Sequence, residues 1–271
     1  MKVEYKMCQE YTLIDCEMNK DLSHKYWNSE ELEENKVFNV IKNGYEGLEK
    51  SQHLRKVYNQ FLTLTDHEII RKFKEFKELH IISIGSGIGW LEAWWLQGKA
   101  FANASLMDYS KHRIHKIAPE LFKHYNIQGK VNFIYGSMES FDFDYHSVDI
   151  CILIQAFHHY DQPLAMLRRL KKTLKPGGVI IIAGEPDFTN RDYFIRSFKH
   201  FAKYILNYKG YRKMHHIFPG WQDLFPPDMV KGDIHYSLKE YIHFFQRAGF
   251  GNYVISHDKP SRLKGMILVN N

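Results

Sequence analysis

The feature that most constrains this chain is a run of alternating glycines that directly follows a short apolar segment. His80 to Ile84 is mostly apolar, Gly85, Gly87 and Gly89 come next, and an amphipathic stretch begins after them. This order predicts a strand, a tight turn and a helix. Glycines let the backbone approach a ligand closely, and a helix start offers free N–H groups and a positive dipole end. The segment therefore predicts a nucleotide-type site at the carboxyl end of a parallel strand.

The spacing of these glycines argues against a dinucleotide site. The dinucleotide fingerprint is G-x-G-x-x-G. Here the third glycine comes one residue early, at Gly89, and Trp90 holds the fingerprint's third-glycine position. An oxidoreductase of the NAD type therefore remains an alternative that the sequence disfavours.

The chain after the turn alternates strand-like and helix-like segments. We expect strands at 104–107, 131–135, 148–154 and 179–183, and helices at 111–125 and 163–174. The segment 148–154 is almost wholly apolar, as in a strand that is buried on both faces. The alternation predicts an α/β fold with a parallel sheet and right-handed crossovers.

Three segments lie outside this alternation. Residues 1–77 are expected to form an N-terminal helical cap. Its helices open at Ser29, cover 54–64 and start again near Asp66. Tyr26 and Trp27 either close over a cofactor or pack the cap onto the sheet. Residues 78–271 form the main domain, which an aromatic and basic insertion at 186–236 interrupts. A capping box opens a helix from Ser237 to Ala248, and strands at 253–256 and 266–269 follow.

Composition narrows the class of protein. The chain has 271 residues, a net charge of +6 and 3 cysteines, with no C-x-x-C pair. This argues against a disulfide scaffold or a zinc ribbon. We expect a cytoplasmic protein, because the sequence shows neither a signal-peptide core nor an apolar run of membrane-spanning length. The positive charge admits an anionic substrate, nucleic acid or a membrane surface.

A series of motifs over residues 78–184 resembles class I S-adenosylmethionine-dependent methyltransferases of the small-molecule type. The glycine turn matches the first motif, and Asp108 stands where that family places the acid that binds both ribose hydroxyls. Residues 136–143 resemble the adenine loop, although Ser137 replaces its usual Asp. Residues 147–155 resemble the fourth strand, 156–161 the Leu-His-His-x-x-Asp segment with its Asp one residue early, and 174–178 the Leu-Lys-Pro-Gly-Gly turn.

This resemblance implies a Rossmann-like, doubly wound sheet that is mostly parallel and has an antiparallel last strand. It also implies S-adenosyl-L-methionine as the cofactor. The residues expected to bind this cofactor lie in the turn, at the end of the second strand, in the adenine loop and at the end of the fourth strand: Gly85, Ser86, Gly87, Gly89, Asp108, Tyr109, Ser137, Met138, Glu139 and Gln155.

Two histidines are the candidate catalytic residues. His158 and His159 follow the fourth strand, where methyl donor and acceptor meet in the family. One of them could orient the acceptor or take its proton, because histidine titrates near neutrality; alternatively, the pair packs or contacts the cofactor. Further candidates are His215, His216, His235 and Glu185. The spacings of these residues match no metal-ligand signature, so we expect no metal.

The insertion carries an excess of basic residues. Between 187 and 216 they are Arg191, Arg196, Lys199, Lys203, Lys209, Arg212 and Lys213, opposed only by Asp187 and Asp192. One helical face is expected to carry Phe194, Phe198, Phe201 and Ile205. Four interpretations compete: a lid for a phosphorylated or nucleotide-linked small molecule, a basic patch for RNA, an amphipathic membrane-surface helix, and a solvated helix packed by its aromatics. Nucleic acid is disfavoured, since no separate RNA-binding module is visible.

The hypothesis from sequence is a methyltransferase that transfers to an oxygen of a small anionic or sugar-like metabolite. The segment Gly232 to Tyr236 faintly resembles methyltransferases that modify bacterial surface sugars, which suggests surface-polysaccharide biosynthesis. The alternatives are a methyltransferase acting on RNA or protein, the oxidoreductase, and a cofactor-binding protein without catalysis.

Overall fold

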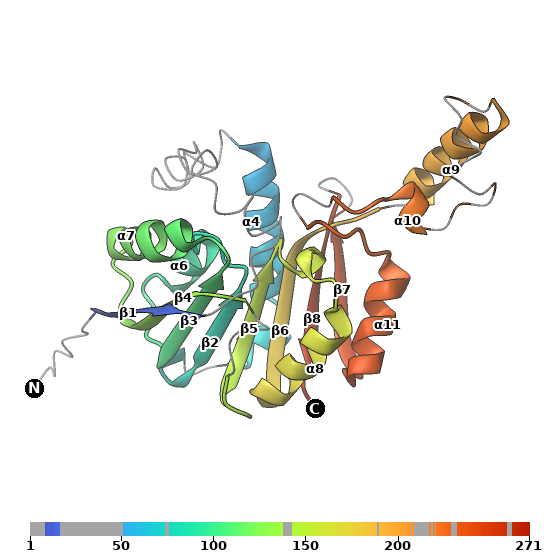
Figure 1. Ribbon diagram of the computed structural model, residues 1–271. Coiled ribbons are helices and arrows are strands. Elements are labelled where there is room, and N and C mark those ends of the chain that lie inside the picture. Colours follow the sequence, from blue (N-terminus) through green and yellow to red (C-terminus); the bar gives the residue numbers. More distant parts are fainter. Residues whose placement is uncertain are drawn as a thin grey trace, which may run out of the picture.

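The computed structural model describes residues 9–16, 51–73, 76–137, 143–188, 190–206, 208, 217, 219, 221–228, 232–258 and 262–271. These residues form one eight-stranded sheet in the order β1-β4-β3-β2-β5-β6-β8-β7, with helices on both faces (Figure 1). The strands are β1 (Gln9–Asp15), β2 (His80–Ile84), β3 (Asn103–Asp108), β4 (Gly129–Tyr135), β5 (Val148–Ile154), β6 (Leu174–Pro186), β7 (Asn252–Asp258) and β8 (Leu263–Val269).

The strand order fixes where a ligand can bind. The strands from β1 to β6 pair in parallel, whereas β8 is antiparallel to both of its neighbours, β6 and β7. Strand β2 has β3 on one side and β5 on the other, so the direction of winding reverses between β2 and β5. In such sheets the crevice at the carboxyl ends of the strands, at this reversal, is the ligand site.

Each face of the sheet has its own apolar core. Helices α4 (Gln52–Thr65), α6 (Trp90–Leu96) and α7 (Ala118–His124) contribute to one core, and α8 (Pro163–Thr173) and α11 (Leu238–Ala248) to the other. The sheet is therefore doubly wound, as the sequence predicts, and its central strands are buried on both faces.

The expected strands and βαβ alternation are confirmed, with three differences in detail. Strand β6 is longer than 179–183, because Leu174 pairs with Val148 and Pro186 with Leu263. The helix expected at 111–125 has a π-helical turn, η3 (Arg113–Ile117), before α7. The helix expected from Asp66 is instead a short α5 (Glu68–Arg71) and a 3-10 turn, η2 (Phe76–Glu78).

Strand β1 was not expected, because we assigned the N-terminal part to a helical cap. It pairs in parallel with β4 at the sheet edge, and the Tyr11 ring packs edge-on against Phe133 with 5.6 Å between centroids. Its residues Tyr11 to Ile14 are of the types that favour strands. The helix expected from Ser29, with Tyr26 and Trp27, lies outside the described residues, and the domain boundary at 77 stays a prediction.

The insertion contains α9 (Asn190–Ile205), which extends away from the sheet, and the short α10 (Trp221–Leu224) (Figure 1). The expected capping box is confirmed at α11: Glu240 N–H donates to Ser237 Oγ at 3.3 Å, and Ser237 N–H donates to Glu240 Oε2 at 2.6 Å. Among the described residues, no helix combines the length and the apolar character needed to span a bilayer.

Candidate active site

The glycine turn joins β2 to α6 in a left-handed conformation. Gly85, Gly87 and Gly89 have φ values of +66°, +58° and +67°, which L side chains rarely adopt. A Cβ on Gly85 would lie 2.6 Å from Ala156 Cβ, and one on Gly89 would overlap Leu106 and Phe122. A Cβ on Gly87 would meet no atom within 4 Å. Two of the glycines therefore serve packing, whereas Gly87 leaves open space at the turn, as a bound cofactor requires.

The Asp108 carboxylate ends β3 next to this turn. Its Oδ2 accepts a hydrogen bond from Gly87 N–H at 2.7 Å, and its Oδ1 accepts one from Ser110 N–H at 2.8 Å. The side chain is half-buried, and each carboxylate oxygen has a second lone pair for a further donor. The structure thus brings together the turn and the acid that the sequence assigned to one cofactor.

The other described residues expected to bind the cofactor lie in the turn and just after strands β3 and β4. Ser86 is buried and its hydroxyl donates to Met107 O at 3.3 Å, so it fastens the turn to β3. Tyr109 is half-buried directly after β3, and Ser137 is buried shortly after β4. Met138 and Glu139 lie outside the described residues.

Gln155 follows β5 in a left-handed conformation, with φ of +52°. Its N–H donates to Ala183 O at 2.8 Å, and its side-chain Nε2 donates to His53 Nε2 at 2.9 Å. His53 belongs to α4, so this helix reaches the edge of the site, which the sequence did not indicate. In the same helix, Gln60 Oε1 accepts from Gly184 N–H at 2.6 Å.

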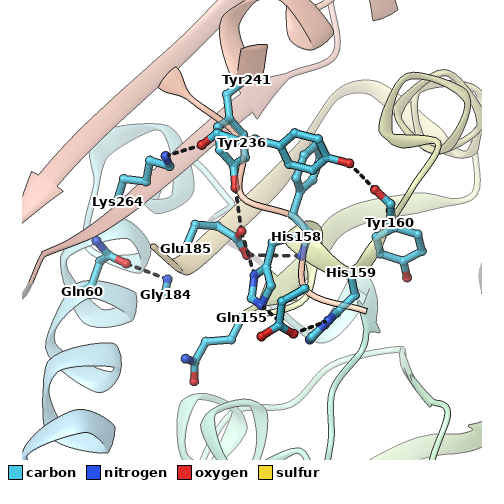
Figure 2. Close-up of polar contacts among 12 residues, drawn as sticks. Gln60, Gln155, His158, His159, Tyr160, Gly184, Glu185, Tyr236, Tyr241 and Lys264 are labelled. Carbon is cyan, nitrogen blue, oxygen red and sulfur yellow. Dashed lines mark hydrogen bonds and ion pairs between the residues drawn. The ribbon is translucent and has the colours of Figure 1, made fainter. Parts of the chain in front are cut away.

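The core of the site is a fully buried carboxylate that holds one histidine (Figure 2). Glu185 has no exposed surface, and its Oε2 accepts hydrogen bonds from His158 Nδ1 at 3.0 Å and from the Tyr241 hydroxyl at 2.7 Å. Its Oε1 accepts from Phe157 N–H at 3.2 Å. Because the hydrogen bond from Nδ1 to Glu185 fixes the orientation of the ring, Nε2 is the nitrogen that can contact a bound molecule.

Burial tends to lower the pKa of His158, but the charge and hydrogen bond of Glu185, together with Asp233, raise it above its ordinary value; Lys264 opposes them. Burial would raise the pKa of Glu185, yet His158 and Tyr241 hold it below its ordinary value. The raised pKa of His158 makes this histidine a stronger proton acceptor than a free imidazole. Burial also lowers the pKa of Lys264 to about 8, against the pull of the carboxylates of Asp187 and Glu185.

Asp233 joins the site from the segment before α11. Ile234 N–H donates to His158 O at 2.7 Å, which holds this segment against the histidines. Asp233 Oδ1 lies 3.2 Å from His159 Nδ1 and 4.0 Å from His158 Nε2. Across the described part of the chain, these three residues form the one group whose ligand-type atoms could surround a cation, within 4.8 Å of one another. Their distances equally suit ion pairs.

Of the other candidate residues, His235 lies beside this group and His215 and His216 lie outside the described residues. Burial lowers the pKa of His235, partly against the pull of Asp233. Its Nδ1 is buried and meets no hydrogen-bond partner in the described structure. This nitrogen is therefore available to a bound molecule.

One of the basic residues of the insertion, Arg196, contacts other residues of the insertion. Arg196 donates to Leu224 O at 2.6 Å, and its guanidinium lies 4.3 Å from the centroid of the Phe225 ring. Lys209, Arg212 and Lys213 lie outside the described residues. The residues expected on one helical face do share one, but that face is exposed to solvent.

Comparisons with known proteins agree with this architecture. Residues 82–182 match the family model described as a methyltransferase domain. A curated relative, the malonyl-[acyl-carrier protein] O-methyltransferase of Halalkalibacterium halodurans, is 26% identical over 142 residues. The match covers 51% of this chain and 49% of the relative, so it spans about half of the relative's length.

Two solved structures share the fold at low identity. The magnesium protoporphyrin IX methyltransferase of Synechocystis PCC 6803, solved with bound SAH, aligns with a TM-score of 0.59 and 12% identity over 93% of this chain and 100% of that one. A SAM-dependent methyltransferase of Leishmania major aligns with a TM-score of 0.55 and 11% identity over 91% and 80% of the two chains.

Proposed function

We propose that this chain, whose residues 82–182 match a methyltransferase-domain model, is a class I S-adenosylmethionine-dependent methyltransferase that methylates a hydroxyl oxygen of a small anionic or sugar-like molecule. The observation that carries the choice of a hydroxyl is the buried Glu185–His158 pair at the carboxyl edge of the sheet. A carboxylate acceptor is already ionised at neutral pH, whereas a hydroxyl gives up its proton only with help from a base.

The residues of the turn and of β3 would hold the cofactor. Gly87 leaves open space at the turn, and the Asp108 carboxylate is placed to accept further hydrogen bonds from ribose hydroxyls. When bound, S-adenosylmethionine supplies a methyl group on a positively charged sulfur, which is a good leaving group. The roles of Ser86, Tyr109, Ser137 and Gln155 toward the cofactor belong to the same proposal.

His158 accepts the proton of the acceptor hydroxyl at Nε2. Glu185 keeps the proton of the neutral ring on Nδ1 and stabilises the imidazolium that forms, as in other histidine–carboxylate pairs. His159 and Asp233 lie beside His158, and the Nδ1 of His235 would contact the acceptor. The chain's contribution is thus to position the acceptor and to hold one proton.

The relative's name supports oxygen as the acceptor atom, because that protein is an O-methyltransferase. The segment that holds Asp233 and His235 is the one whose sequence resembles methyltransferases of bacterial surface sugars. A sugar hydroxyl is therefore our first choice of acceptor, in surface-polysaccharide biosynthesis.

The test is release of S-adenosylhomocysteine with labelled cofactor and a panel of sugar, phosphosugar, carboxylic-acid and RNA acceptors. With a hydroxyl acceptor, His158→Gln should lower kcat by about 10²–10⁴-fold, the usual contribution of general base catalysis, without changing S-adenosylhomocysteine affinity. His80→Gln, a matched change at the amino end of β2, should leave both unchanged. Turnover of a carboxylic acid alone, with His158→Gln fully active, would refute the proposal.

A further inference from the structure

In the described structure, the contacts of helix α9 with Trp221 and Leu224 lie along one side of the helix. Tyr193 stacks on Trp221 with 6.1 Å between ring centroids and 9° between planes, and Arg196 donates to Leu224 O at 2.6 Å. His200 is 3% exposed on the same side. Positions 193, 196 and 200 lie on one face of a helix, and this face of α9 therefore packs against the rest of the protein.

A different face of α9 is apolar and exposed. Phe194, Phe198, Phe201 and Ile205 are 72%, 67%, 49% and 49% exposed, and their spacing of four, three and four residues places them in one stripe. Eight of the twelve large exposed apolar side chains in the described structure lie between 193 and 208. Since single exposed apolar residues are ordinary but a concentrated patch is not, this stripe indicates a binding surface.

Helix α9 also carries exposed basic residues. Arg191, Lys199 and Lys203 are all exposed to solvent on this helix. The one acid of α9, Asp192, forms an ion pair with Arg262. A helix with an apolar aromatic stripe and exposed basic residues matches one that lies in the headgroup region of an anionic bilayer, where phenylalanines enter the acyl boundary and basic side chains meet lipid phosphates.

We propose that α9 docks on the surface of a membrane that contains anionic lipids, with Phe194, Phe198 and Phe201 inserted and Arg191 and Lys199 at the headgroups. The helix extends away from the sheet (Figure 1), and the side chains of its stripe are exposed to solvent. The docking is peripheral, in keeping with the finding that no described helix could span a bilayer. It is a function separate from methyl transfer and does not depend on the identity of the acceptor.

The test is co-sedimentation of the full chain with vesicles of phosphatidylcholine alone or mixed with phosphatidylglycerol. We expect binding to the mixed vesicles that weakens at high salt, and little binding to phosphatidylcholine. The double variant Phe194→Ser, Phe198→Ser should bind at least about tenfold more weakly, because it removes most of the inserted area. Arg191→Gln with Lys199→Gln should abolish the preference for the anionic lipid.

Tyr145→Ser is the matched control, since Tyr145 is 73% exposed but lies in the turn before β5. It should bind vesicles as the wild type does. All variants should keep the wild-type thermal shift with S-adenosylhomocysteine, which shows that they fold and separates this proposal from the proposed reaction. Equal sedimentation of the wild type and the Phe194→Ser, Phe198→Ser variant would overturn the proposal. A dimer that this variant dissociates, without vesicle binding, would assign the stripe to a second copy and overturn it as well.

Discussion

Replacing Gly87 by alanine separates cofactor binding from backbone strain, because the chain offers a matched control. Gly87 and Gly98 have similar φ values, +58° and +72°, and a Cβ at either position meets nothing within 4 Å. Gly98 lies after the end of α6, away from the turn. The two substitutions therefore impose the same backbone strain, but only the one at Gly87 fills the space next to Asp108.

The magnitude follows from two opposing contributions. A left-handed conformation costs an L-residue about 1–2 kcal/mol, and alanine recovers about 0.4–1 kcal/mol through the smaller entropy of its unfolded chain. Both variants should thus lose up to about 1.6 kcal/mol in free energy of unfolding. Gly89→Ala should lose about 1–3 kcal/mol more, the range for an overpacked core, because its Cβ overlaps Leu106 and Phe122.

The assay combines urea unfolding with calorimetric titration of S-adenosylhomocysteine. We expect Gly87→Ala to weaken binding at least tenfold, or about 1.4 kcal/mol, and Gly98→Ala to leave it unchanged. Wild-type affinity in Gly87→Ala would refute the view that the turn faces the cofactor. Unequal losses of stability in the two variants would refute the strain argument instead.

Further predictions concern the charged groups. Asp108→Ala should weaken S-adenosylhomocysteine binding by about 1–3 kcal/mol in calorimetry, and unchanged affinity would remove its ribose role. Burial raises the pKa of Glu92 to about 7, so the folded state holds a proton that the unfolded state releases. Stability should then fall by up to about 3 kcal/mol as the pH rises from about 4.5 to above 7, and in Glu92→Gln this slope should vanish from urea titrations. Glu185 raises the pKa of His158, so in Glu185→Gln the acidic limb of the kcat–pH profile should move to lower pH; an unmoved limb would contradict His158 as the base. Activity should survive chelation by EDTA, because the carboxylates of Glu185 and Asp233 pair with His158 and His159 without a cation. A loss of activity that a divalent cation restores would instead make His158, His159 and Asp233 a metal site.

Most of the sheet could be predicted from sequence because its signals are local. Each central strand is a short apolar run, and each crossover helix has its own periodicity or cap, as at Ser237. Strand β1 has residues with strand propensity but is not a buried apolar run: Leu13 is 54% exposed, and the strand pairs with the edge that β4 offers. The long β6 likewise depends on its partners β5 and β8 rather than on its own composition.

The candidate site likewise contains residues that the sequence could predict and residues that it could not. The glycine turn and Asp108 could be predicted, because Asp108 comes only 21 positions after Gly87. The helix and strand between them place both residues at the ends of neighbouring strands. The partners of His158 could not. Tyr241 and Asp233 belong to α11 and the segment before it, and no spacing along the chain indicates that they converge on Glu185 or the histidines. His53 reaches Gln155 from 102 residues away for the same reason.

The pairing of β1 with β4 has a consequence for biosynthesis. Gln9 lies opposite Gly129, and this register continues to Asp15 opposite Tyr135. Strand β1 therefore leaves the ribosome long before β4, its neighbour in the described sheet, exists. At about 5–20 residues per second, the delay is roughly 6–24 seconds. During that interval its backbone groups have no partner strand, and the sheet can close at this edge only after the three-strand unit of β2, β3 and β4 has been made. A chaperone or a nascent-chain interaction that protects residues 9–15 would act in this window.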